Sequence, residues 1–298
     1  MTAPTLTSTL VTTTWLKDNI DHPKLIVLDA SSHMPGANRD AFSEWQEKRI
    51  TGARFFDFNH KICDTTSSLP HMMPTEAVFA QEARALGIHE DSIVIIYDSL
   101  GIFSSPRAWW MLTTMGHKHC AILDGGLPQW EKDQGGIDQG LTENKAIDET
   151  ASEQETAKGT FSAKLNINNI KNSHEILAAI GQETISILDA RSPARFNGTA
   201  PEPREGLISG HIPSSKNLPF PSLISNGKMK PNDELKRTFA ALLKPEQTLY
   251  ASCGSGVTAC IIAFAAHLIG IKNIAVYDGS WSEWGQPERQ LPINTDQE

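Results

Sequence analysis

The sequence repeats itself on the scale of a whole domain, and this repetition constrains the fold more than any other feature. Four short segments of the first half recur in the same order in the second half. The offsets are 160, 158, 155 and 154 residues for the pairs Asp29 and Asp189, Gly52 and Gly210, Asp98 and Cys253, and Trp130 and Trp284. Offsets that shrink slowly indicate a duplicated domain with small deletions, because chance matches would scatter. We therefore expect two domains of one fold rather than a solenoid array.

The chain of 298 residues is long enough for two domains that each bury a core. We place the first domain at residues 1–134 and the second at residues 161–298. Residues 135–160 carry many acids and few large apolar side chains, which predicts an exposed linker. In each half, β-branched apolar runs alternate with helical patterns. This alternation predicts an α/β fold in which a mostly parallel sheet carries helices on both faces.

Composition excludes several classes of protein. A hydrophobic content of 39% and a charged content of 20% describe an ordinary globular chain, and the net charge of −9 argues against nucleic-acid binding. No apolar stretch is long enough for a membrane span, and the first residues do not resemble a secretory signal, so we expect a cytoplasmic protein without a membrane partner. The four cysteines form no zinc-binding pattern, and no metal or organic cofactor is implied.

One cysteine lies where a predicted strand meets a predicted helix. The segment 250–259 reads Tyr-Ala-Ser-Cys-Gly-Ser-Gly-Val-Thr-Ala, and helices are expected at 106–115 and 257–269, just after Asp98 and Cys253. Gly254 and Gly256 permit a tight turn that points successive backbone N–H groups at one centre. Those donors and the positive end of a buried, largely apolar helix would favour a thiolate at Cys253, which is the reactive form.

The other three cysteines fit a simpler interpretation, in which a free cysteine is a small core residue. Cys260 lies within the apolar helix and Cys120 in a short apolar run, so we expect both in the core. Cys63 lies in a loop and is expected to be a surface thiol without an assigned role.

The segment Cys-Gly-Ser-Gly-Val-Thr-Ala resembles the active-site loop of the 3-mercaptopyruvate sulfurtransferases, a branch of the tandem-rhodanese family. The resemblance runs from about residue 14 to residue 293 and includes segments 106–110, 210–213 and 278–284. It implies two rhodanese-like domains, an inactive first and a catalytic second. The residues agree independently, since Asp98 stands at the position equivalent to Cys253 and a carboxylate cannot carry a persulfide.

The resemblance further implies a sulfurtransferase that moves sulfur from 3-mercaptopyruvate through a persulfide on Cys253 to a thiol or to cyanide, releasing pyruvate. Thioredoxin or a low-molecular-weight thiol is the implied acceptor. Arg195 and Arg204 match the family's substrate-binding pattern Arg-Phe…Pro-Arg, and guanidinium groups grip planar carboxylates through paired hydrogen bonds. The residues expected to cradle the persulfide anion are Gly254, Ser255, Gly256, Val257 and Thr258.

The resemblance assigns supporting roles to three further residues. Ser255 would be a polar partner of the reaction and His71 its support, while Arg191 resembles a structural arginine that forms an ion pair. The sequence departs from the family at the aspartate expected to act with this histidine, because that position is Asn59. Asp64 matches a different acid of the motif, so we assign no aspartate to this role.

Three alternative functions are weighed against this interpretation. A thiosulfate sulfurtransferase would use the same nucleophile, but Gly254 and Ser255 replace the cationic loop residues that a dianionic donor favours. A dual-specificity phosphatase of the Cys-x5-Arg type requires an arginine where this chain has Ala259. A non-catalytic sulfur carrier or redox module would use Cys253 without multiple turnover.

Overall fold

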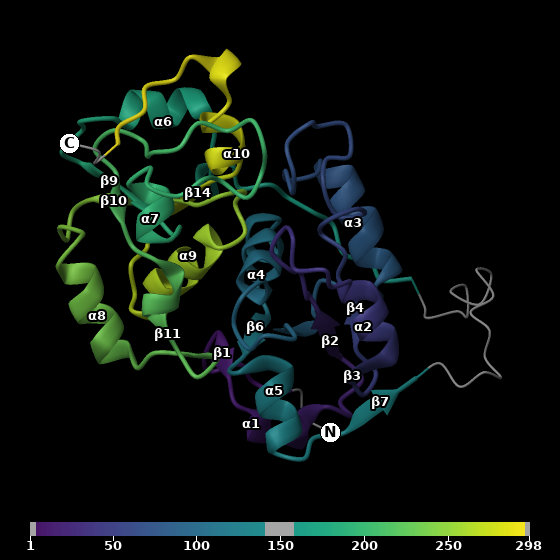
Figure 1. Cartoon of the computed structure of the whole chain (residues 1–298). Coiled ribbons are helices and arrows are strands. Elements are labelled where there is room, and N and C mark those ends of the chain that lie inside the picture. The colour runs from purple at the N-terminus through teal and green to yellow at the C-terminus, as the bar shows by residue number, and fades with distance from the viewer. Residues whose placement is uncertain (1–3, 141–157, 296–298) are drawn as a thin grey trace. The chain divides into compact units, whose positions relative to one another are not determined.

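The computed structural model describes residues 4–140 and 158–295, and these residues form two compact units (Figure 1). The first unit contains the described residues within 1–63, 74–165 and 226–228. The second unit contains residues 64–73 and 166–225 together with the described residues from 229 onward. None of the helices in these described ranges has the length and hydrophobicity that a membrane crossing requires.

The two units have sheets of the same topology. In the first unit the five-stranded parallel sheet has the order β1-β6-β5-β2-β4. These strands are β1 (Leu10–Val11), β2 (Leu25–Asp29), β4 (Arg54–Phe55), β5 (Ile93–Tyr97) and β6 (Cys120–Leu123). In the second unit the order is β8-β14-β13-β9-β10, again with parallel pairing. These strands are β8 (Ile170–Lys171), β9 (Ile185–Asp189), β10 (Lys216–Asn217), β13 (Thr248–Ser252) and β14 (Ile274–Tyr277). The same order of equivalent strands supports the duplication inferred from the sequence.

Helices form the connections between successive strands of each sheet, as parallel pairing requires, and one further helix follows the last strand of each sheet. In the first unit they are α1 (Thr13–Asn19), α2 (Ala41–Glu47), α3 (Glu76–Ala85), α4 (Ser105–Thr114) and α5 (Gly126–Lys132). In the second unit they are α6 (Ser173–Ala179), α7 (Pro193–Phe196), α8 (Asn232–Ala240), α9 (Ala259–Leu268) and α10 (Ser280–Trp284). The helices expected at 106–115 and 257–269 are confirmed as α4 and α9, and α9 is buried from Ala259 to Ala266. Several starts are fixed by side-chain caps; Asn172 and Glu175, for example, form a complete capping box at α6.

The remaining short elements lie outside the two main sheets. Strand β3 (Lys48–Ile50) pairs antiparallel with β7 (Ile137–Gln139), and β11 (Ile224–Ser225) pairs with β12 (Lys228–Met229). Short 3-10 helices occupy Ile167–Asn169, Phe220–Leu223 and Pro287–Arg289.

The first unit extends past the boundary expected at residue 134. Strand β7 lies inside the predicted linker 135–160 and pairs with β3. After the segment 141–157, which lies outside the described residues, the N–H of Gly159 donates to the carbonyl of Arg84 at 2.9 Å. The ring of Phe161 is fully buried and packs edge-on against Phe79. Backbone pairing and an aromatic anchor thus tie both ends of the predicted linker to the first unit.

Residues 64–73 also depart from the expected boundaries, because they belong to the second unit. The N–H of Met73 donates to the carboxylate of Asp278 at 2.7 Å, across a sequence separation of 205 residues. This charge-assisted contact places a segment of the N-terminal half beside the end of β14.

Equivalent tryptophans lie in the two hydrophobic cores. Trp130 and Trp284 are each almost fully buried. Each indole N–H donates to a backbone carbonyl, of Gly136 at 2.8 Å and of Pro292 at 2.9 Å. Both tryptophans therefore bury a large apolar surface with their single donor satisfied. Each of them packs its helix, α5 or α10, against the hydrophobic core of its unit.

Candidate active site

Cys253 directly follows β13, and backbone hydrogen bonds fix its position. Its N–H donates to the hydroxyl of Ser280 at 3.2 Å, and its carbonyl accepts from the N–H of Trp281 at 3.0 Å. The preceding carbonyl, of Ser252, accepts from the N–H of Ala190 at 2.9 Å. Cys253 is only 1% exposed. The thiol is thus held at the carboxyl edge of the parallel sheet, which is where open α/β sheets bind their ligands.

The loop after Cys253 directs its carbonyl groups away from its amide groups. The carbonyl of Gly254 accepts both the N–H and the hydroxyl of Ser282, at 2.8 and 2.6 Å. Gly256 has a φ of 76°, a left-handed conformation that favours glycine, and its carbonyl accepts from the thiol of Cys260. Within the described ranges, no backbone hydrogen bond uses the N–H of Ser255 or Val257 as its donor. The loop therefore has amide donors that take no part in its own backbone hydrogen bonds.

The equivalent loop of the first unit shows what such an arrangement binds. Asp98 follows β5 as Cys253 follows β13. Its Oδ2 accepts hydrogen bonds from the N–H groups of Phe103, Ser104 and Ser105 at 2.8, 3.0 and 2.9 Å, and from the hydroxyl of Ser105 at 2.7 Å. The start of α4 is thus occupied by a negatively charged oxygen that the chain itself supplies, as a helix N-terminus favours.

The first residues of α4 and α9 are Ser105 and Ala259, so the donors that surround Asp98 have counterparts around Val257 and Thr258. In the second unit the residue at the strand end is a cysteine instead of an aspartate. An anionic sulfur on that cysteine would occupy the place that a carboxylate oxygen occupies in the first unit.

The structure brings both predicted arginines to this loop. Arg195 lies on α7, and its Nη2 is 3.0 Å from the position that a Cβ on Gly254 would occupy. Burial lowers the pKa of Arg204; the charge of Arg195 lowers it further, while Cys253 and Glu202 act in the opposite direction. Two cationic groups of an acidic protein therefore lie close to the candidate nucleophile.

Glu202 orients the first of these arginines, and the sequence analysis did not identify it. Its carboxylate accepts from Nε of Arg195 at 3.2 Å and from Nη1 of Arg191 at 2.9 Å, and it is also bonded by Nη2 of Arg195. The Glu202 side chain is 2% exposed. The signal in the sequence was a carboxylate between two prolines, Pro201 and Pro203, in the segment that separates the two arginines.

Arg191 has the structural role that the sequence predicts. Its guanidinium is fully buried, pairs with Asp189 at 2.6 Å, and lies 4.0 Å from the ring of Trp281. It also donates to the carbonyl of Gly210 at 2.8 Å. The expected ion pair is therefore confirmed, and it connects the end of β9 to Glu202.

Ser255 and His71, the two residues expected to support the reaction, lie in different parts of the second unit. Ser255 is buried in the Cys253 loop. His71 has a φ of 62° and lies two residues before Met73, whose N–H binds Asp278. Asp278 begins the turn that leads to Ser280, the partner of the Cys253 amide. Contacts between backbone segments thus connect the region of His71 to the support of the nucleophile.

The side chains of Asn59 and Asp64, the two positions compared with the acids of the family motif, form hydrogen bonds with other residues. The amide of Asn59, at the family's aspartate position, bonds with the hydroxyl of Ser32 in the first unit. The carboxylate of Asp64 accepts the N–H and the hydroxyl of Thr66 at 3.0 and 2.6 Å. Neither arrangement supplies the missing aspartate.

Two of the other cysteines are core residues, as expected, and one expectation is corrected. Cys120 and Cys260 are buried, and burial raises the pKa of the Cys120 thiol to about 12. Cys63, expected at the surface, is also buried at 6% exposure. Its Sγ lies 3.4 Å from the carbonyl of Asn59, because the loop folds back on itself in a helical turn.

These features define the class of protein. The model of the rhodanese-like domain matches residues 12–133 and again residues 172–287, and the chain belongs to the rhodanese-like family. The duplicated α/β fold expected from the sequence and the resemblance to this family are thereby confirmed.

Named relatives place the chain within a branch of that family. It is 40% identical over 302 residues to the 3-mercaptopyruvate sulfurtransferase of Mus musculus, covering 97% of this chain and 96% of that protein. It is also 40% identical over 284 residues to the thiosulfate sulfurtransferase of Mus musculus, covering 92% and 91%. Among solved structures it is similar to SseA from Escherichia coli, described as a 3-mercaptopyruvate sulfotransferase. The TM-score is 0.80 at 37% identity, covering 93% of this chain and 100% of that chain. Identity alone does not separate the two donors, so the site must do so.

Proposed function

We propose that this chain transfers sulfur from 3-mercaptopyruvate through a persulfide on Cys253 to a thiol or to cyanide, and releases pyruvate. The observation that carries this proposal is the position of Arg195 against the loop of a buried cysteine, together with the electrostatic interaction of Arg204 with that cysteine. 3-Mercaptopyruvate offers a carboxylate and a keto oxygen beside its sulfur, and two guanidinium groups match those two acceptors.

In the first step the thiolate of Cys253 attacks the sulfur of the donor. The new S–S bond forms as the C–S bond breaks, and the electron pair of the broken bond leaves with the three-carbon fragment as the enolate of pyruvate. Arg195 and Arg204 hold the carboxylate and the keto oxygen, so they stabilise the charge that develops on the enolate. The enolate takes a proton through Ser255 or a water molecule.

In the second step the persulfide gives its outer sulfur to the acceptor. The acceptor thiolate, or cyanide, attacks the outer sulfur, the S–S bond breaks, and the thiolate of Cys253 is restored. This is a ping-pong scheme with a covalent intermediate. The backbone N–H groups of Gly254 to Thr258 stabilise the persulfide anion, in the way that the equivalent loop binds the carboxylate of Asp98.

The remaining assignments belong to the same proposal. His71 supports Ser255 from the segment that is fixed to Asp278. A thiol acceptor is the partner, with thioredoxin or a low-molecular-weight thiol as the proposed examples. The four cysteines are thiols rather than halves of disulfides, which is typical of a reducing compartment, and we propose the cytoplasm.

Thiosulfate transfer is the second candidate function, because it needs the same nucleophile. Thiosulfate is a dianion without a planar carboxylate, so cationic groups directly on the loop would serve it best. Gly254 and Ser255 supply no such cationic group. The arrangement therefore favours the keto acid. A sulfur carrier or redox module without turnover would not need two arginines beside the cysteine.

The test compares two donors on one preparation. Steady-state pyruvate release from 3-mercaptopyruvate with a thiol acceptor is measured beside transfer from thiosulfate to cyanide. We expect 3-mercaptopyruvate to be favoured at least tenfold in kcat/KM, and Cys253→Ser to abolish both reactions without loss of the fold. The matched control is Cys260→Ser, which also replaces a buried thiol. Turnover by the Cys253→Ser variant would exclude Cys253 as the nucleophile. A preference for thiosulfate would overturn only the assignment of 3-mercaptopyruvate as the donor.

A further inference from the structure

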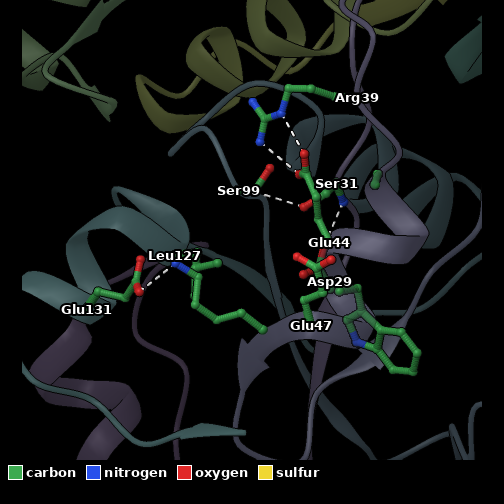
Figure 2. A pocket seen from close by; sticks show the side chains of 11 residues that line it. Asp29, Ser31, Arg39, Glu44, Glu47, Ser99, Leu127 and Glu131 are labelled. Atoms are coloured by element: carbon green, nitrogen blue, oxygen red, sulfur yellow. Dashed lines mark hydrogen bonds and ion pairs between the residues drawn. The ribbon is translucent and has the colours of Figure 1, made fainter. Parts of the chain in front are cut away.

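The first unit contains a cavity at the carboxyl edge of its sheet, beside Asp29 (Figure 2). Its volume is about 230 Å³, several times the roughly 30 Å³ that one water molecule occupies in the liquid. Figure 2 shows the Arg39–Glu44 pair on one side of Asp29, and Leu127 with Glu131 on the other. The residues that line the cavity include Asp29, Ser31, Glu44, Glu47, Lys48 and Leu127.

The second unit identifies what fills the equivalent space there. Ser31 and Arg191 are equivalent, since the N–H of each donates to the carboxylate of the aspartate that ends the strand, at 2.8 and 2.9 Å. Leu127 and Trp281 are also equivalent, since the N–H of each donates to the carbonyl of the residue after the central strand, at 3.1 and 3.0 Å. In the second unit the guanidinium of Arg191 and the ring of Trp281 pack together beside Asp189.

The cavity follows from two replacements by smaller side chains. The first unit has a serine hydroxyl where the second has a guanidinium, and a leucine where the second has an indole. The aspartate itself is retained. The space that remains therefore lies against a carboxylate that, in the duplicate domain, binds a guanidinium group.

Asp29 forms no ion pair with a cation in the described part of the chain. It is 2% exposed, accepts from the N–H of Ser31 at 2.8 Å, and is also bonded by the hydroxyl of Tyr97. In the described ranges, none of the ion pairs involves Asp29, whereas Asp189 is paired with Arg191. Burial raises the pKa of Asp29 to about 6, which is the expected consequence of a buried carboxyl group without a cation.

The rest of the lining leaves the cavity negative. Arg39 pairs with Glu44 at 2.6 Å and Lys48 pairs with Glu131 at 2.8 Å. The positive and negative charges within each of these two ion pairs cancel. Among the residues that the structure describes, none of the ion pairs includes Asp29 or Glu47, two carboxyl groups of the lining, so a positively charged ligand would meet a favourable potential.

We propose that the cavity beside Asp29 binds the guanidinium group of a small organic cation. A planar guanidinium can donate two parallel hydrogen bonds to a carboxylate, which is how Nε and Nη2 of Arg191 meet Oδ1 and Oδ2 of Asp189, at 3.1 and 2.6 Å. The ligand supplies in the first domain the group that the second domain carries as a side chain.

The test uses methylguanidinium as the probe and the full chain as the target. Two-dimensional amide NMR during a titration should show saturable shifts confined to residues near Asp29, Ser31 and Lys48. N-methylurea has nearly the same shape without the charge, and it should produce at least tenfold weaker binding. Equal responses to the two compounds, or no saturable response to methylguanidinium, would overturn the proposal.

Two variants separate the cavity from other anionic surfaces. Ser31→Arg places a guanidinium where the second domain has one, so the variant should lose the methylguanidinium response while keeping its fold. Asp29→Asn should weaken binding at least tenfold, and it provides the test if Ser31→Arg does not fold. Retained binding in either folded variant would overturn the proposal. Neither residue belongs to the proposed sulfur-transfer site, so pyruvate release measured in parallel tests that function separately.

Discussion

The carboxylate of Glu202 holds the guanidinium of Arg195, with Nε 3.2 Å from both carboxylate oxygens. The same carboxylate binds Arg191, so one buried acid joins a structural arginine to the arginine that lies against the loop of Cys253. The orientation of Arg195 thus depends on a residue that need not touch the substrate.

Glu202→Gln should weaken substrate binding more than it slows chemistry. The amide keeps the shape of the carboxylate but loses its charge and one acceptor, which leaves the buried guanidinium of Arg191 and the partly buried guanidinium of Arg195 less well paired. We expect KM for 3-mercaptopyruvate to rise about tenfold with a smaller change in kcat, and partial rescue by Glu202→Asp. Glu205→Gln is the matched control, because Glu205 is an exposed acid of the same segment. A loss confined to kcat would show that Glu202 acts otherwise than by positioning Arg195.

Asp98→Asn should destabilise the first domain without entering the chemistry. Hydrogen bonds to a charged acceptor contribute about 1.5–3 kcal/mol each and those to a neutral acceptor less, and the Oδ2 of Asp98 accepts four. We expect the free energy of unfolding to fall by about 2 kcal/mol in urea denaturation. Asp91→Asn, at an exposed surface ion pair, should change it by much less. Unchanged stability of Asp98→Asn would contradict the reading of this loop as an anion-binding site.

Asp29 should make the protein less stable as the pH rises through 6. The pKa of Asp29 is about 6 in the folded protein against 3.8 for the unperturbed group. The folded state therefore holds the proton more tightly, and stability is highest below pH 4 for this group and declines between pH 4 and 6. At about 1.4 kcal/mol per pKa unit, the loss is about 3 kcal/mol at most. The charged or titratable groups around Asp29 are Tyr97, Asp98, Arg39, Glu44, Glu47, Lys48 and Glu131.

The variant Asp29→Asn isolates this contribution, since it keeps the size of the side chain and removes the titration. Thermal unfolding at pH 5 and pH 7.5 should show a smaller decline for the variant than for the parent chain. Identical declines would mean that other groups dominate this pH range.

Gly256→Ala should reduce sulfur transfer by distorting the loop. An alanine at φ 76° costs about 1–2 kcal/mol in the left-handed region, and the strain falls on the amide donors after Cys253. We expect kcat/KM to fall at least tenfold. Gly270→Ala is the matched control, because Gly270 has a φ of 89° and open space around it at the far end of α9. It should lose similar stability and keep its activity, and equal loss of activity in both variants would point to a general effect of destabilisation.

The sequence predicted the features that depend on local pattern. Repeated apolar strands, each followed by a turn and a helix, indicate parallel sheets whose carboxyl edges meet, so Cys253 could be placed at a strand end before any contact was known. Arg195 and Arg204 were identified by the spacing of a family motif. The burial of α9 followed from its apolar circumference.

Features that depend on distant contacts were not predictable in this way. Residues 64–73 join the second unit, where the N–H of Met73 donates to the carboxylate of Asp278, 205 residues further along the chain. The role of Glu202 depends on its contacts with Arg191 and Arg195, which lie 11 and 7 residues earlier in the chain. The burial of Cys63 and the cavity beside Asp29 arise from packing, which hydrophobic periodicity does not encode.

The presence of Asp98 in place of a cysteine also bears on how many sulfur atoms one polypeptide can carry. A duplicated protein with a cysteine in both loops would store two sulfur atoms per chain, and each could be discharged independently. Here the first loop is occupied by the side chain of Asp98, which has no sulfur to load. On the proposed function, loading with excess donor in the absence of acceptor saturates at one sulfane sulfur per polypeptide, seen as a single 32 Da step in intact mass (about the mass of one sulfur atom).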